Sequence, residues 1–200
     1  EEMGGVRGIK HYMQRVAVQG SPTTITAVTN VYQPHARGKD PGKHPFQKYF
    51  EELQIGDQII TDKRLITSED IDRFADLSGD HFYAHIKTTN FTGTMFEQQV
   101  AHGYFIMSAA AGLFVDSYEM NPVLLNYGID ELRFTKPVYP GTEIYVRFTC
   151  KEKLSQDNKP GANEEIPRGI VKWLVEILDD TDEPIVGVAS ILTMVKRKDS

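Results

Sequence analysis

The 200-residue sequence contains a single cysteine, Cys150. One thiol cannot form an internal disulfide or supply the ligands of a cysteine-based zinc site. This composition fits a reducing compartment, and we expect a cytoplasmic protein. The sequence also has no run near the roughly 18 apolar residues of a membrane span. No basic segment followed by an apolar one opens it, so no signal peptide is expected.

Positive charge is scarce as well. The formal net charge is −6, and no cluster of lysine and arginine large enough for a nucleic-acid surface offsets it. Neither the phosphate-binding G-x-x-x-x-G-K-[ST] loop nor the G-x-S-x-G nucleophile turn occurs. These absences argue against a nucleic-acid partner and against two large classes of enzyme. A small anionic substrate needs only two or three local cations and is not excluded.

One change in composition divides the chain. Residues 33–45 contain three prolines and two glycines and no apolar run, which is typical of a linker. We therefore predict a tail over residues 1–32, a linker over 33–48 and one domain over 49–200. Because the sequence does not begin with methionine, we also expect it to be a piece of a longer protein.

Two helices are predicted at the start of this domain. Thr67 is a suitable N-cap, acidic residues follow it, and Gly79 suits a left-handed C-terminal cap. The segment from Tyr104 to Val115 is apolar on every face, which predicts a helix that is buried all round.

The second half of the domain alternates with period two. Residues 143–151 read as a half-buried strand, and residues 170–178 and 185–195 as further strands joined by an acidic turn at 179–184. No helical pattern separates them, so a parallel β-α-β sheet is not expected. The pattern indicates an α+β protein in which an antiparallel sheet wraps around a long buried central helix. Cys150 and Trp173 fall on strand positions that are expected to face the core.

Asp80 and His85 are the first candidates for chemistry. Asp80 follows the predicted helix directly, and His85 lies five residues on in an aromatic segment. A carboxylate and an imidazole in such a setting can activate a water molecule for addition to a polarised double bond. The spacing equally allows a structural interpretation, in which Asp80 caps a turn and His85 is a hydrogen-bonded core histidine.

The second candidate is the turn before the apolar helix. Gly103 allows a ligand close to the backbone, and free N–H groups at a helix start suit an oxyanion such as a thioester enolate. A plain tight turn explains the same residues. A metal site at His81, His85 and His102 is not expected, because no carboxylate stands at H-E-x-x-H spacing.

Residues 49–195 resemble the MaoC-like, (R)-specific enoyl-CoA hydratase family. The resemblance rests on four blocks in order: residues 74–80 ending in Asp80, His85, the Ala-His-Gly turn at 101–103, and residues 132–142. It implies a hotdog fold, usually dimeric. It also implies that Asp80 and His85 hold the attacking water, that the Gly103 N–H binds the thioester oxygen, and that His102 lines the substrate site.

The sequence departs from the family pattern beside the pair. Phe82 and Tyr83 stand where the family has asparagine and proline, which implies a more aromatic substrate-binding wall. Residues 1–15 look like the end of an aldehyde dehydrogenase domain. Together these features resemble the bifunctional ring-opening enzymes of bacterial phenylacetate degradation, whose hydratase domain hydrolyses oxepin-CoA.

The resemblance also sets expectations for ligands and partners. The substrate is a CoA thioester, no cofactor or metal is required, and NADP would serve only the absent dehydrogenase domain. A homodimer or higher homo-oligomer without nucleic acid or membrane is expected. Three other activities stay open: a general (R)-specific enoyl-CoA hydratase, a non-catalytic hotdog assembly module, and a hotdog thioesterase.

Overall fold

The computed structural model describes residues 31–32, 43–115, 120–154, 166–181 and 186–198. One sheet with the order β1-β2-β5-β6-β7-β4 dominates it, and β3 also pairs with β5. The strands are β1 (Val31–Tyr32), β2 (Gln58–Ile60), β3 (Arg64–Leu65), β4 (Val123–Phe134), β5 (Glu143–Leu154), β6 (Arg168–Asp179) and β7 (Gly187–Lys196). All pairings are antiparallel except that of β1 with β2.

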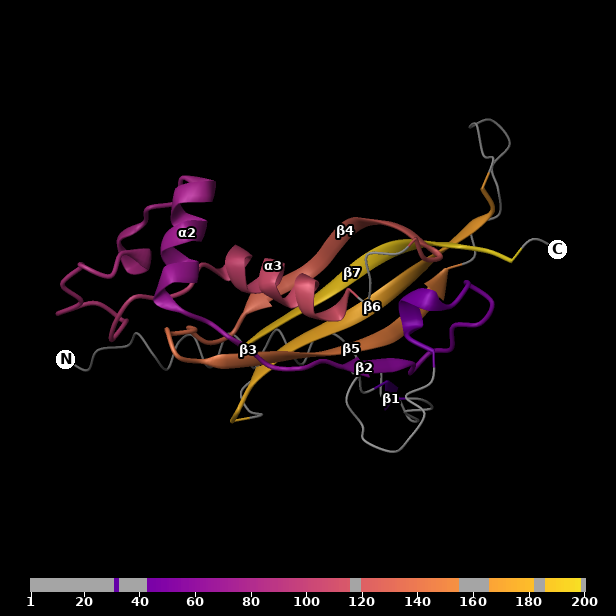
Figure 1. Ribbon diagram of the computed structural model, residues 1–200, viewed down its shortest axis with the longest axis horizontal. Helices are drawn as coiled ribbons and strands as arrows, with labels where there is room; N and C mark the ends of the chain where they lie inside the picture. Colours follow the sequence, from indigo (N-terminus) through magenta and orange to yellow (C-terminus); the bar gives the residue numbers. More distant parts are fainter. Residues whose placement is uncertain (1–30, 33–42, 116–119, 155–165, 182–185, 199–200) are drawn as a thin grey trace, which may run out of the picture.

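Two α-helices are described, α2 (Ser68–Ser78) and α3 (Gly103–Phe114). Figure 1 shows α3 lying along one face of the sheet, with α2 beyond the end of the sheet. The buried side of α3 and the inner face of the long strands form one apolar core. The predicted α+β class and hotdog arrangement are confirmed. No helix in the described part of the chain has the length and apolar character needed to cross a membrane.

The limits of α2 follow the predicted caps. The Thr67 hydroxyl accepts from the Asp70 backbone N–H at 3.1 Å, and the Asp70 carboxylate accepts from the Thr67 N–H at 3.2 Å. Gly79 ends the helix with φ of 76°, which an L side chain adopts only with strain. Ile71 and Ala75 are buried. Asp80 follows this cap directly, so the end of the helix determines the position of Asp80.

The prediction that the second helix is buried all round is wrong on one face. Phe105, Ile106, Ala110 and other side chains of α3 pack into the core, but Tyr104 is 70% exposed. Ser108 and Gly112, one and two turns on, are exposed too. A single sheet covers only one side of a helix, so an apolar sequence alone does not bury the other.

Part of the predicted linker belongs to the packed domain. Phe46, in the 3₁₀ turn η1 (Pro45–Gln47), is 5% exposed. Its ring makes edge contacts with Phe114, Phe148 and Trp173 at centroid distances of 6.1, 5.5 and 5.8 Å. Burial of this one aromatic ring holds the segment against the core, although the residues around it have the composition of a linker. Residues 33–42 of that linker, and residues 1–30 of the predicted tail, lie outside the described residues.

The three predicted strands are found as β5, β6 and β7; β5 and β6 are longer than predicted, and β7 begins two residues later and ends one residue later. Trp173 is fully buried and donates from Nε1 to the Thr193 hydroxyl at 2.8 Å, so its predicted place in the core is confirmed. Residues 182–184 of the predicted acidic turn lie outside the described residues. Strand β4 was not predicted, because bulges interrupt its pairing with β7 and its side chains do not alternate cleanly.

Cys150 offers a direct test of this core. It is fully buried on β5, and burial raises the pKa of its thiol to about 12. Since the thiolate is the reactive form, the native protein is expected not to react with a chromogenic thiol reagent at pH 8. The urea-unfolded protein should react fully within minutes. Equal reaction rates in the two states, followed by absorbance, would contradict this placement of β5.

Candidate active site

Asp80 lies in the exposed turn that follows α2. Its backbone N–H donates to the Ser78 hydroxyl at 3.2 Å, and its Oδ1 accepts from the Phe82 N–H at 3.2 Å. Within the described residues, Oδ2 has no hydrogen-bond partner. The carboxylate therefore does cap a turn, as the structural interpretation holds, and it keeps one oxygen for another ligand.

His85 ends the 3₁₀ turn η2 (Tyr83–His85) and is half-buried. Its Nδ1 lies 2.7 Å from the carbonyl oxygen of Val100. Because a carbonyl only accepts, Nδ1 must carry the proton, which leaves the lone pair of the neutral ring on Nε2. Nε2 is thus the atom that can take a proton from water.

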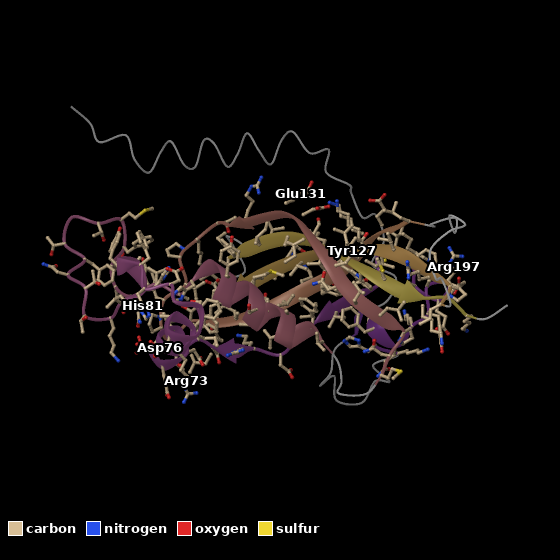
Figure 2. All side chains as sticks on the ribbon, turned by 90° about the horizontal axis from the view of Figure 1, so that it is seen from above. Arg73, Asp76, His81, Tyr127, Glu131 and Arg197 are labelled. Carbon is tan, nitrogen blue, oxygen red and sulfur yellow. The ribbon has the colours of Figure 1, made fainter. Side chains whose placement is uncertain are left out.

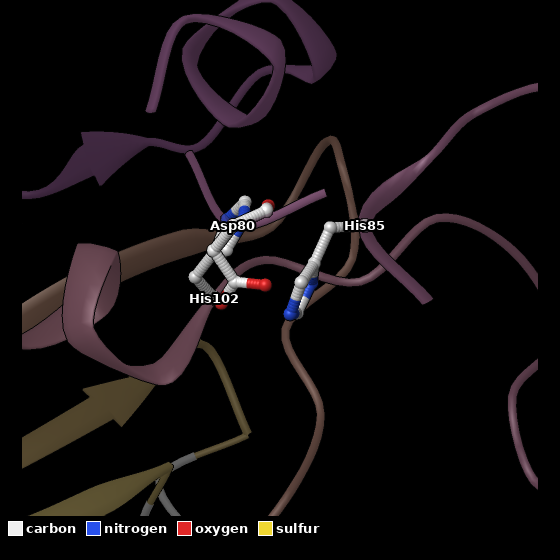
Figure 3. Close-up of side chains that lie close together, drawn as sticks. All are labelled: Asp80, His85 and His102. Atoms are coloured by element: carbon white, nitrogen blue, oxygen red, sulfur yellow. The ribbon is translucent and has the colours of Figure 1, made fainter. Parts of the chain in front are cut away.

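His102 joins these two residues. It is 1% exposed, its Nε2 lies 2.9 Å from the Asp80 carbonyl oxygen, and its ring stacks on that of His85 with centroids 3.7 Å apart. One carboxylate oxygen of Asp80 and one ring nitrogen each of His85 and His102 lie within 4.8 Å of one another. Figure 3 shows the three side chains gathered in one place. The structure therefore brings together Asp80 and His85, which the sequence proposed as a pair.

The same three residues are the only described cluster with the composition of a metal site. The two imidazole planes, however, are inclined by only 26° in the stack. Ring nitrogens bind metals along lone pairs that lie in the ring plane, so one ion cannot lie in line with both stacked rings. The stacked geometry does not suit a metal ion bound by both rings.

Gly103 begins α3 directly after His102. Its N–H is one of the first-turn donors that lack a partner within the helix. A Cβ at this position would lie 2.4 Å from the Phe134 ring, which covers Gly103 closely. A cavity of about 300 Å³ opens here, with Gly103, Phe96, Ile106 and Phe134 among its lining residues. A small apolar ligand in this cavity would thus lie against the start of α3.

Phe82 and Tyr83 lie beside His85 rather than in the core. Their rings are 4.5 Å apart, and the Phe82 ring lies 6.1 Å from His85. Phe82 is 56% exposed and Tyr83 is 41% exposed. Both are therefore free to contact a substrate, and that role stays a prediction, as do the catalytic roles of Asp80, His85 and Gly103.

Gln99 is a site residue that sequence reasoning missed. It is buried, and its Nε2 donates to the His85 carbonyl at 2.8 Å and to the Asp72 carboxylate at 2.9 Å. Its Oε1 accepts from the Ser68 hydroxyl. A hydrogen bond from Lys87 lowers the pKa of Asp72, so this acceptor stays ionised. Gln99 thus joins η2 to α2 through hydrogen bonds. No local sequence pattern indicates this role.

Solved structures of similar shape share this fold. A monoamine oxidase regulatory protein from Archaeoglobus fulgius matches with a TM-score of 0.67 and 28% identity, over 76% of this chain and 96% of that one. An R-hydratase from Pseudomonas aeruginosa matches at 0.58 and 21%, over 75% and 86%. A conserved hypothetical protein from Mycobacterium tuberculosis with a double hotdog fold matches at 0.62 and 18%, over 76% of this chain but 44% of its own.

The sequence comparisons agree with these matches. Protein MaoC of Klebsiella aerogenes is 50% identical over 167 residues, which are 84% of this chain and 49% of that protein. The chain spans about half the length of the curated relatives it matches. The profile described as "MaoC like domain" matches residues 51–166, which include Asp80, His85 and Gly103. The chain therefore belongs to the family of MaoC-like domains.

Proposed function

We propose that this chain adds water to the double bond of an α,β-unsaturated acyl-CoA thioester. The observation that supports it is the placement of Asp80 and His85, because a carboxylate oxygen of the first lies within 4.8 Å of a ring nitrogen of the second. One water molecule spans such a gap with two ordinary hydrogen bonds. An R-hydratase is among the proteins that share the fold.

Each group then has one task. The Asp80 and His85 pair orients the water, and one of them takes its proton as the oxygen attacks the β-carbon. Electrons move through the former double bond to the thioester oxygen, where the Gly103 N–H stabilises the enolate. The proton returns to the α-carbon. No cofactor takes part, because water supplies every atom that is added.

We further propose that the preferred substrate is oxepin-CoA, a cyclic enol ether conjugated to the thioester. Water added at the oxygen-bearing carbon gives a hemiacetal. The ring C–O bond then breaks, the former ring oxygen takes a proton, and the attacked carbon becomes an aldehyde. The exposed rings of Phe82 and Tyr83 offer an aromatic surface to an unsaturated seven-membered ring, and the cavity at Gly103 is a separate space that these two rings do not line.

The test compares oxepin-CoA with crotonyl-CoA, a linear substrate, under identical conditions. We expect a higher kcat/KM for oxepin-CoA, with aldehyde formed in step with substrate loss. A higher value for crotonyl-CoA would instead identify a general enoyl-CoA hydratase. Release of free CoA would identify a thioesterase, and turnover of neither compound would favour a non-catalytic assembly module.

We propose that the active form is a homodimer in which a second copy packs against the edge strand β4. Leu125, Tyr127 and Ile129 on the edge strand β4 are exposed apolar side chains, at 43 to 47%, and Figure 2 labels Tyr127 on this strand. The double hotdog protein supports a second copy as the occupant, since this chain matches less than half of it. A monomer at concentrations that support full turnover, measured by sedimentation, would contradict the proposal.

A further inference from the structure

His102 contacts both Asp80 and His85, and it lies far from both in the sequence. In its other hydrogen bonds Asp80 donates from its N–H to the Ser78 hydroxyl and accepts at Oδ1 from the Phe82 N–H, both within its own turn. The bond from His102 Nε2 is the one described contact of this type that ties Asp80 to a distant part of the chain. The same ring provides the flat surface on which His85 stacks.

His102 is itself held firmly. It is the N-cap of α3, it is 1% exposed, and its ring lies 5.0 Å from the ring of Phe74 on α2. Any shift of this imidazole would require the start of α3 to move against the core. The buried His102 side chain, which is held in place, is therefore in contact with Asp80, which is exposed, and with His85, which is half-buried.

The ring is also built to stay neutral. Its Nε2 must carry the proton, because a carbonyl accepts it, and its Nδ1 is buried without a hydrogen-bond partner among the described residues. Protonation would create a buried N–H without an acceptor, and burial lowers the pKa of this imidazole. The hydrogen bond to the Asp80 carbonyl and the Asp80 carboxylate act in the opposite direction, but burial is the larger effect and the net pKa is lowered. A group held neutral in this way is unsuited to proton transfer.

We propose that His102 is a positioning residue for the Asp80 and His85 pair and does not contact the substrate. One edge of the ring fixes the Asp80 backbone through Nε2–H, and one face supports His85, so that the Asp80 carboxylate and the His85 ring keep their separation. This inference rests on the proposed hydration of a thioester and replaces the substrate contact that the resemblance implied for His102.

Three variants separate the two contacts. His102→Gln keeps an N–H donor at similar reach but loses the flat ring, His102→Phe keeps a ring but loses the donor, and His102→Ala loses both. A misplacement near 1 Å costs on the order of 10²-fold in rate. We therefore expect His102→Ala to lower kcat about 100-fold with KM nearly unchanged, and each of the other two to recover part of the loss.

His44→Gln is the matched control, because His44 is also buried, at 4% exposure, but is the N-cap of η1. It should lower the Tm without lowering the kcat of the folded protein. A raised KM with unchanged kcat in the His102 variants would overturn the proposal in favour of a substrate contact. Equal losses in all three, in proportion to the loss of folded protein, would overturn it in favour of a purely structural role.

A second readout does not depend on turnover. Ring stacking shifts the His85 ring proton resonances, so nuclear magnetic resonance should show them displaced in wild type and in His102→Phe, and released in His102→Ala. Identical His85 resonances in all three proteins would overturn the proposal. If wild type hydrates no thioester but the resonances behave as expected, the proposed function fails while the positioning role stands.

Discussion

An Asp80→Asn variant is expected to lose roughly 10²- to 10⁴-fold in kcat on any thioester that the wild type hydrates, the range that general acid–base catalysis contributes. Asparagine keeps an oxygen that accepts from the Phe82 N–H, so the turn is retained. What it loses is the negative charge and the basicity of the free oxygen. The expected defect is therefore in turnover, while the Tm should stay within a degree or two of wild type.

Asp76→Asn provides the matched control for this experiment. Asp76 is exposed on α2, one turn before Asp80, and the substitution removes the same charge from the same end of the molecule. It should leave kcat and KM unchanged. If Asp80→Asn retains the wild-type rate, Asp80 is not the base and its capping bond to Phe82 is its whole role. If Asp76→Asn loses as much as Asp80→Asn, the effect arises from overall charge.

The parts of the fold that could be predicted are those with local causes. The α2 helix begins at a hydroxyl cap and ends at a glycine, and both signals lie within a turn of the residues they affect. The alternation along β5 reflects one buried face in the same direct way. The open face of α3 and the burial of Phe46 depend on which elements lie opposite them, and the sequence order does not show that.

The same distinction between local and long-range causes applies to the residues of the site. Asp80, His85 and Gly103 could be proposed as candidates because their residue types and the turns that hold them are visible in the sequence. The stack of His85 on His102 and the three hydrogen bonds of Gln99 join segments from 14 to 31 residues apart. Such contacts follow only from the packing of α2 against the start of α3. For this reason the sequence predicted which residues are present but not how they are held.

The largest expected loss of stability is that of Phe148→Ala. Phe148 is fully buried on β5 and stacks between two rings, Phe114 of α3 at 4.4 Å and Trp173 of β6 at 4.6 Å. Truncating a buried phenylalanine costs about 3 to 5 kcal/mol, from lost apolar burial and the cavity that remains. Since domains of this size are stable by only about 5 to 15 kcal/mol, we expect a large shift in the urea midpoint.

Phe82→Ala is the control for stability, because it makes the same truncation on a side chain that is 56% exposed. It should change the free energy of unfolding by no more than about 0.5 kcal/mol. A loss below about 1 kcal/mol for Phe148→Ala would mean that the ring stack does not join α3 to the sheet.

The large loss of stability expected for Phe148→Ala also has a consequence for the site. Phe114 ends the same helix that begins beside His102, so a loosened stack should also lower kcat in the fraction of protein that remains folded.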